Sequence, residues 1–434
     1  LAIIYNLSMK DLIKPIIINI LTWEAKLVLK KHKPFIIGVT GNLGKTSTKD
    51  AIYAVMKQHF YTRRSEKSMN SEFGVPLTVL GEKSGWNNPL QWLVIIVRGF
   101  FVIWQKSYPT HLVLEIGADR PGDIKTIASW VKPNITVVTQ FGQVPVHIEF
   151  FPDRDAVINE KGYLVEALND NGLFIYNADD HDAKKLLEKT KARKVSFGIH
   201  EDADARATNV KFYGHPIEGT ESDVMVDKKN HHIVLPEVAG KSSVYCSIPA
   251  LLVARELNIS LEVASASLRD ADKPKGRMRL LRGMNGSTII DDTYNASPKA
   301  TEHGLKTLGE MDVKGRKIAV LGDMLELGSH TRDEHYKIGM VATKSCHKLY
   351  TVGIRARVIA EGALDGKMSD ENIMQCDTSI DAGKELVQVL GPNDVIYMKG
   401  SQGIRMERAV KMILAETHNP AQVLVRQEKE WLSR

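Results

Sequence analysis

Cysteine is scarce in this sequence: three occur among 434 residues, and they lie far apart. Cys246, Cys346 and Cys376 have neither the even number of a disulfide set nor the close spacing of a zinc site. This scarcity excludes a disulfide-built secreted domain and a structural zinc module. We predict reduced, buried thiols in a cytoplasmic protein.

Apolar runs long enough to cross a membrane are also missing. A spanning helix needs about 20 consecutive apolar residues, but Lys14 and Pro15 interrupt the run over residues 12–23. No small-residue cleavage site follows, so we expect no secretory signal. We interpret residues 1–33 as an apolar helical leader packed on the domain that follows, with contact to a membrane surface as the alternative.

A second apolar run, residues 92–104, carries Arg98 at its middle and is too short to span. A helix that is apolar on all sides is usually buried, and that is our expectation here. Trp92 and Trp104 stand at its two ends, and tryptophan favours membrane–water interfaces. Peripheral membrane contact over residues 90–104 is therefore the alternative.

A concentrated positive charge is absent as well. The 58 Lys and Arg residues are interleaved with 52 Asp and Glu residues, for a formal net charge of +6. No basic stripe with interleaved aromatic residues is present, so we expect no nucleic acid as partner. The hydrophobic share of 43% and the charged share of 25% are ordinary for a globular protein, and the length suggests about two or three domains.

The sequence does contain a stretch typical of a phosphate-binding loop. Residues 34–39 are predicted to form an apolar strand, residues 40–49 read Thr-Gly-Asn-Leu-Gly-Lys-Thr-Ser-Thr-Lys, and residues 50–56 continue as a helix. Glycines let backbone N–H groups surround a polyphosphate at a helix N-terminus. Lys45 would then reach the outer phosphates and Thr46 would bind Mg²⁺, although the short spacing Gly-x-x-Gly-Lys-Thr leaves an ordinary glycine turn as the alternative. The predicted nucleotide contacts in this loop are Gly41, Asn42, Gly44, Lys45, Thr46 and Ser47.

Beyond the loop, apolar strands alternate with helical segments, which predicts an α/β fold with mostly parallel sheets. Residues 270–277 are charged and contain a proline and a glycine, so they form the best linker. We predict a central P-loop ATP-binding domain over residues 34–272, in which residues 195–240 hold short strands and turns. A Rossmann-like α/β domain over residues 273–434 follows, without a dinucleotide-binding Gly-x-Gly-x-x-Gly. The other strands are expected at residues 112–117, 135–139 and 173–176, and at 288–292, 317–323, 348–353 and 394–400.

Ligand-binding side chains are expected at strand ends beside the phosphate loop, because parallel strands bring their carboxyl ends to one edge. Glu115 ends one expected strand, and a carboxylate there can hold Mg²⁺. His147 follows the next strand and could ligate a second cation. Taken alone, the first could be a solvated carboxylate and the second a structural histidine. Beside a phosphate loop, the metal-binding interpretation is favoured.

Several short segments follow one another in an order found in a known family. They are residues 40–46, 114–119, 147–149, 160–162, 177–180, 276–277, 291–298, 321–328 and 399–401. On these segments the chain resembles the Mur ligases over about residues 34–415. It is most similar to the members that add D-alanyl-D-alanine to UDP-N-acetylmuramoyl-tripeptide, with Asp-Asp-Thr-Tyr-Asn-Ala (291–296) and Gly-Asp-Met-Leu-Glu-Leu-Gly (322–328) as the most specific segments.

The resemblance implies ATP-driven amide formation with Mg²⁺, as a pair of ions in the site. A substrate carboxylate takes the γ-phosphate to give an acyl phosphate, and an amine then displaces the phosphate. Lys45 and Thr46 would hold the phosphates and the first ion together with Glu115. His147 would bind the second ion. Lys161 stands where the family has a carbamylated lysine that supports a cation, and an exposed helix lysine is the alternative.

The resemblance also assigns contacts from both domains to the nucleotide and the substrates. Asn177 and Asn295 would contact the adenine, and Arg277 and Asp292 would contact the ribose or phosphates. Lys399 would face the incoming amine, with a strand-end surface lysine as the alternative. The implied partners are small molecules: a nucleotide-sugar peptide or peptide as acceptor, and an amino acid or dipeptide as donor. A monomer is favoured.

Three departures from the family pattern are visible. First, we expect no separate domain that binds the UDP-sugar before residue 34. Second, residues 240–245 stand where the family usually has Gly-x-His-Asn. Third, residues 143–147 differ from the usual Ala-x-x-His. Because of the first departure, one alternative is a Mur-fold ligase that acts on another acceptor, such as a polyglutamate-type or other cell-wall amino-acid ligase. A non-catalytic, membrane-associated nucleotide-binding scaffold is the alternative from another class.

Overall fold

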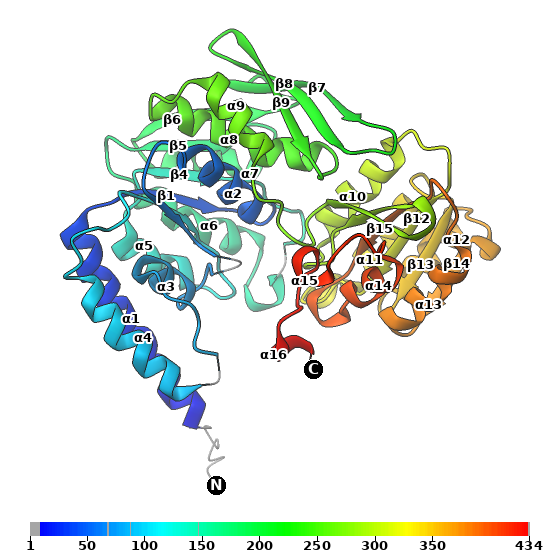
Figure 1. Ribbon diagram of the computed structural model, residues 1–434, viewed down its shortest axis with the longest axis horizontal. Helices are drawn as coiled ribbons and strands as arrows, with labels where there is room; N and C mark the ends of the chain where they lie inside the picture. The colour runs from blue at the N-terminus through cyan, green and yellow to red at the C-terminus, as the bar shows by residue number, and fades with distance from the viewer. Residues whose placement is uncertain (1–8, 67–68, 87, 146, 433–434) are drawn as a thin grey trace.

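Two β-sheets organise the chain, one of nine strands and one of six. The computed structural model describes residues 9–66, 69–86, 88–145 and 147–432. Figure 1 shows the two sheets in separate halves of the molecule, each with helices packed around it. The larger sheet belongs to the predicted central domain and the smaller one to the predicted C-terminal domain.

The nine-stranded sheet is parallel from β2 to β7 and antiparallel beyond, in the order β2-β3-β1-β4-β5-β6-β7-β8-β9. Its central strand β1 (Phe35–Thr40) is buried on both faces, as expected of a parallel strand covered by helices. Ile37 and Val39 face one cluster of core residues and Ile36 faces another. The other strands are β2 (Thr62–Arg64), β3 (His111–Glu115), β4 (Ile135–Val138), β5 (Leu173–Asn177), β6 (Arg193–Gly198), β7 (Ala205–Tyr213), β8 (Gly219–Val226) and β9 (Lys229–Pro236).

Helices cover both faces of this sheet. The helices α2 (Lys45–Met56), α8 (Lys241–Glu256) and α9 (Leu261–Arg269) share one core cluster with the sheet. The opposite face is covered by α1 (Met9–His32), α3 (Gly74–Leu80), α4 (Pro89–Val102), α5 (Asp123–Val131), α6 (Arg154–Glu166) and α7 (His181–Lys185). This arrangement leaves the carboxyl ends of the parallel strands free for ligands.

The six-stranded sheet has the order β10-β11-β15-β12-β13-β14 and is parallel except for its edge strand β10. Its faces carry two core clusters, so the domain is doubly wound. The strands are β10 (Arg279–Arg282), β11 (Thr288–Asp291), β12 (Lys317–Gly322), β13 (Lys348–Val352), β14 (Ile373–Cys376) and β15 (Val395–Lys399). The helices are α10 (Pro298–Glu310), α11 (Thr331–Ala342), α12 (Arg357–Asp365), α13 (Ser379–Val389), α14 (Glu407–Ile413), α15 (Pro420–Val423) and α16 (Lys429–Leu432).

A backbone bridge joins the two halves. Ala239 N–H donates to Met278 O at 2.9 Å, and Leu280 N–H donates to Glu237 O at 2.9 Å. The segment after β9 therefore pairs with the start of β10 in an antiparallel way. The two domains are linked by backbone hydrogen bonds as well as by the covalent chain.

The predicted α/β fold with mostly parallel sheets is confirmed, and each strand expected from the sequence is present. The expectation of short strands over residues 195–240 was wrong for β7, β8 and β9, which have nine, eight and eight residues. Polar residues dominate their outer faces, and this weakens the apolar signal from which strand length is judged. The domain boundaries at residues 33/34 and 272/273 stay predictions.

Helix α1 spans Met9–His32 and packs on the core from Ile17 onward, as expected of the leader, whereas residues 1–8 lie outside the described residues. The second apolar run forms α4, and the expectation that α4 is buried was wrong. One side of α4 packs on the core, but Leu90, Leu93 and Phe101 are 74%, 60% and 61% exposed. Across the described ranges, no helix combines the length and apolarity needed to span a membrane.

The three cysteines are free thiols. Cys346 and Cys376 are buried, as expected, and Cys246 is only partly so. Burial raises the pKa of the Cys246 thiol to about 11, so this thiol stays protonated near neutral pH.

Candidate active site

The phosphate loop connects β1 to α2 and is held in shape by its neighbours. Gly41 and Gly44 have φ values of +134° and +79°, which side-chain-bearing residues rarely adopt. A Cβ atom on Gly41 would lie 2.1 Å from Thr139 Oγ1, so only glycine fits there. Thr139 Oγ1 donates to Leu43 O at 2.6 Å, and Asn42 N–H donates to Gln140 O at 2.8 Å. The loop is therefore fixed before any nucleotide arrives.

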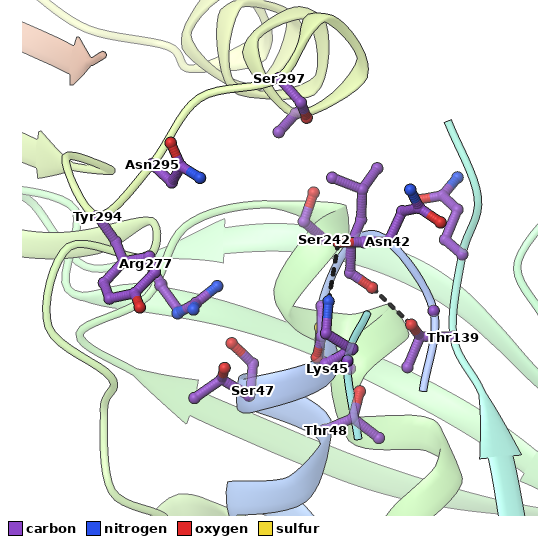
Figure 2. Close-up of a pocket in the computed structure, with 18 of the residues that line it drawn as sticks. Asn42, Lys45, Ser47, Thr48, Thr139, Ser242, Arg277, Tyr294, Asn295 and Ser297 are labelled. Carbon is purple, nitrogen blue, oxygen red and sulfur yellow. Dashed lines mark hydrogen bonds between the residues drawn. The ribbon is translucent and has the colours of Figure 1, made fainter. Parts of the chain in front are cut away.

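Lys45, the first residue of α2, lies over this loop (Figure 2). Its Nζ donates to Asn42 O at 3.3 Å. Burial lowers the pKa of the Lys45 ammonium, while the Glu115 carboxylate acts in the opposite direction. The ammonium faces the space where the phosphates of a nucleotide would lie if they followed the loop.

Oxygen ligands gather beside Lys45. Thr46 Oγ1 donates to Glu115 Oε2 at 2.7 Å, and Asn70 Nδ2 donates to Glu115 Oε1 at 3.0 Å. Glu115 is 1% exposed, so its interpretation as a solvated carboxylate is wrong. Lys49 Nζ lies 3.9 Å from the same carboxylate. Asn70 and Lys49 were not predicted from the sequence, although Lys49 lies one helical turn from Lys45 and therefore on the same face of α2.

Lys161 lies on α6 and is buried, with 4% of its surface exposed. Its interpretation as an exposed helix lysine is therefore wrong. Burial, reinforced by the nearby Lys45 ammonium, lowers the pKa of Lys161 to about 7. The neighbouring Glu160 does not form a hydrogen-bonded pair with it; the Glu160 carboxylate instead accepts backbone N–H groups at the start of α5.

His147 adopts a positive φ of 68° and stands between the two domains. Its Nδ1 lies 2.7 Å from Glu326 Oε2 of the C-terminal domain, and its Nε2 lies 3.5 Å from Asp119 Oδ1. The side-chain contact with His147 lowers the pKa of Glu326. Glu326 was not predicted as a site residue from the sequence, although it lies within residues 322–328, one of the most specific segments.

The C-terminal domain contributes a buried ion pair. Lys399 Nζ lies 2.5 Å from Asp292 Oδ2 and donates to Asn295 O at 2.9 Å. Tyr397 donates its hydroxyl to the same Asp292 oxygen at 3.2 Å. Lys399 is 3% exposed, so it is not the surface lysine that we kept as an alternative. The pairing with Asp292 was not anticipated from the sequence.

The remaining predicted contacts also come from both domains. Arg277 lies 4.2 Å from the centre of the Tyr294 ring, and it faces the loop from across the cavity (Figure 2). Asn177 is buried at the end of β5, where its Oδ1 accepts from Asp179 N–H at 3.0 Å. Tyr245 donates to Asp179 Oδ2 at 2.6 Å, so the segment that departs from Gly-x-His-Asn lies on the wall of the site.

Residues of both domains line one cavity of about 500 Å³. The predicted site residues on its wall are Gly41, Asn42, Gly44, Lys45, Thr46, Ser47, Glu115, His147, Lys161, Asn177, Arg277, Asp292, Asn295 and Lys399. Within the described part of the chain, no three His, Cys, Asp or Glu side chains converge on one point as in an all-protein metal cage. A cation here would need phosphate or substrate oxygens to complete its ligands.

Comparisons with known proteins agree with this architecture. The family model for the Mur ligase middle domain matches residues 39–254, and that for the Mur ligase glutamate ligase domain matches residues 276–402. The UDP-N-acetylmuramoyl-tripeptide–D-alanyl-D-alanine ligase of Bacillus subtilis is 26% identical over 400 residues, spanning 90% of this chain and 78% of that protein. The ligase of the same name from Mycobacterium tuberculosis strain H37Rv is 28% identical over 404 residues, spanning 88% and 73%.

Solved structures show the same fold. The structure of MurF ligase from Thermotoga maritima in complex with ADP superposes with a TM-score of 0.75 at 23% identity, covering 91% of this chain and 83% of that one. Mur ligases are ATP-dependent enzymes that form an amide bond between an acid and an amino acid. The two family models fall on the two halves that meet at the cavity, and we conclude that this chain belongs to the Mur ligase family.

Proposed function

We propose that this chain joins D-alanyl-D-alanine to UDP-N-acetylmuramoyl-tripeptide in the synthesis of peptidoglycan precursors, with ATP as the energy source. The observation that carries the proposal is the single cavity that gathers the phosphate loop and the polar residues of the C-terminal domain. The Bacillus subtilis and Mycobacterium tuberculosis relatives, both named for this reaction, support the choice of substrates.

In this reaction the terminal carboxylate of the acceptor peptide attacks the γ-phosphorus of ATP, and the bond from that phosphorus to ADP breaks. The amine of the donor then attacks the acyl carbon and releases phosphate. Lys45 and the loop N–H groups would hold the phosphates, and Arg277 would offset their charge from the other side. Because both domains line the cavity, their approach would exclude water from the reactive acyl phosphate.

The residues beside the loop fit Mg²⁺, which prefers oxygen ligands and keeps contacts with phosphates and water. The Thr46 hydroxyl and the Glu115 carboxylate, already 2.7 Å apart, would hold a first ion. His147 and a carbamylated Lys161 would hold a second. Bound Mg²⁺ would neutralise negative charge on the transferring phosphoryl group.

Lys161 fits carbamylation for a physical reason. An amine reacts with carbon dioxide only when it is unprotonated, and a pKa of about 7 leaves much of Lys161 neutral at pH 7 to 8. The ammonium first loses one proton; the neutral amine nitrogen then bonds to the carbon of carbon dioxide and loses a second proton. The two proton losses together replace a cation by an anion. A negative group then faces the Lys45 ammonium, where the unmodified side chain places a like charge.

Replacing Lys161 by methionine is expected to lower the ligation rate about a hundredfold, the size of effect seen when one charge-stabilising group is removed. Nuclear magnetic resonance of protein incubated with ¹³C-bicarbonate should show a carbamate carbon in the unsubstituted protein and none in Lys161→Met. Lys191→Met, a change of an exposed lysine, serves as the matched control and should alter neither measurement. Full activity of Lys161→Met, or an unchanged carbamate signal, would contradict the assignment.

The proposed reaction is tested with a set of acceptors. The protein is incubated with ATP, Mg²⁺, D-alanyl-D-alanine and either UDP-N-acetylmuramoyl-tripeptide or the same tripeptide without the UDP-sugar, and products are identified by mass spectrometry. We expect a condensed product with the UDP-linked acceptor and phosphate release that needs both acceptor and donor. A product only with free peptides or glutamyl acceptors would indicate a Mur-fold ligase for another acceptor, and ATP binding without any product would indicate a scaffold.

A further inference from the structure

The helices α1 and α4 lie side by side along the outer edge of the central domain (Figure 1). They run in the same direction, because Val102 near the end of α4 accepts from His32 at the end of α1, at 3.3 Å. The inner side of α4, with Ile95 and Gly99, is buried. At Gly99 the two helices approach closely enough that a Cβ atom there would lie 2.4 Å from Glu24 Oε2. We call this pair of helices the α1/α4 arm.

The outer side of α4 is an uninterrupted apolar stripe. Its residues recur at helical spacing and are each at least 43% exposed: Leu90, Leu93, Val94, Val97, Phe100, Phe101 and, just beyond the helix, Trp104. Ile16 and Trp23 on α1 are also more than half exposed. Six apolar side chains on one face of a helix, together with Trp104 just beyond it, are more than the scattered exposed residues of ordinary protein surfaces. Nothing in the described part of the chain covers the stripe.

The charge around the stripe is mainly positive. Between Lys83 and Leu114 the sequence contains no Asp or Glu. Within α1 the acidic residues are Asp11 and Glu24, and Glu24 is buried. Burial raises the pKa of Glu24 to about 7, so about half of this carboxyl group is neutral at pH 7. Exposed basic side chains on the arm and at its ends are Lys26, Lys30, Lys31, Lys33, Arg98 and Lys106.

Several of these basic side chains lie beside the aromatic end of the stripe. Lys31 Nζ is 4.9 Å from the centre of the Trp104 ring, and Lys106 follows two residues later. Acidic residues of neighbouring elements do not surround this end: Glu72 pairs with Lys14, and Glu82 influences Arg98 on the flank of α4. A second copy of the chain packed on the same stripe would bring like charges together, which disfavours self-association.

We propose that the α1/α4 arm lies on the surface of a bilayer that contains anionic lipids. The apolar stripe enters the headgroup region, tryptophan lies at the boundary, and the lysines contact lipid phosphates. The helix is too short to span, so this contact is peripheral. The cavity of the candidate active site contains no residue of the arm, so lipid contact and ligation are independent properties.

The proposal is tested by sedimenting the full chain with vesicles. We expect binding to vesicles of phosphatidylglycerol, weaker binding to vesicles of phosphatidylcholine, and loss of the difference at high salt. The double variant Leu93→Asp/Phe101→Asp should weaken partitioning at least about a hundredfold. Lys30→Ala/Lys106→Ala should weaken it roughly 25-fold, about fivefold for each lysine.

Ile354→Asp is the matched control, since Ile354 is 78% exposed but lies in the C-terminal domain. This variant should bind vesicles as the unsubstituted protein does, and all variants should keep their affinity for ATP if they are folded. Absence of vesicle binding, or equal binding by Leu93→Asp/Phe101→Asp, would overturn the proposal. So would a concentration-dependent dimer in the absence of lipid that Leu93→Asp/Phe101→Asp abolishes, because the stripe would then be an interface between copies.

Discussion

Replacing Lys45 by alanine is expected to lower the rate of ATP-dependent ligation about a thousandfold. The Lys45 ammonium lies over the phosphate loop on the cavity wall, and the Glu115 carboxylate is near enough to raise its pKa against the effect of burial. Removing a fixed charge that stabilises a transferring phosphoryl group costs rates of this order. The backbone of the loop does not depend on the Lys45 side chain, since residues 139 and 140 and the Cys246 thiol also form hydrogen bonds with it.

The measurement is phosphate release in the presence of acceptor and donor, accompanied by calorimetry of ATP binding with Mg²⁺. Lys57→Ala is a matched control because Lys57 is exposed at the far end of the same helix. It should leave rate and affinity unchanged. If Lys45→Ala kept the rate of the control while remaining folded, the phosphate loop would not be where the chemistry occurs.

Replacing Lys399 by methionine is expected to lower the free energy of unfolding by about 3–5 kcal/mol. The substitution leaves the Asp292 carboxylate, which is 8% exposed, without its counter-charge. Tyr397 would remain as a hydrogen-bond donor to it, but a hydroxyl does not neutralise a buried anion. Urea-induced unfolding of the substituted and unsubstituted proteins provides the measurement.

Two further variants make this result specific. Asp292→Asn combined with Lys399→Met removes both charges and should recover much of the lost stability. Lys306→Met removes a lysine that lies 2.6 Å from Glu302 on an exposed helix surface, and such pairs contribute about 0–1 kcal/mol. Equal stability of Lys399→Met and Lys306→Met would show that the buried pair has no special role.

Much of the fold could be predicted because local sequence determines it. Apolar strands such as β1 and β12 end at glycine or hydroxyl-bearing residues, and α2 begins where the phosphate loop ends. The outer face of α4 could not be predicted in this way. A sequence shows that a helix is apolar on all sides, but only the packing shows that one of those sides has no neighbour.

The sequence predicted which residues belong to the candidate site, but not which of them contact one another. Every proposed side chain lines the same cavity. The partners Glu326 for His147 and Asp292 for Lys399 were not foreseen, because each pair joins segments more than one hundred residues apart. Strand ends indicate which edge a residue occupies, whereas the contact between two particular side chains depends on how the domains meet.

The backbone bridge between the segment after β9 and the start of β10 limits how the cavity can admit a bulky acceptor. Its hydrogen bonds, Ala239 to Met278 and Leu280 to Glu237, keep these segments at the spacing of neighbouring strands. The contact between His147 and Glu326 is a single pair of side chains and separates more easily. We therefore expect the domains to rotate about the bridged side, so that an angle of rotation limits the size of substrate that can enter. Spin labels on the two sheets would measure this angle.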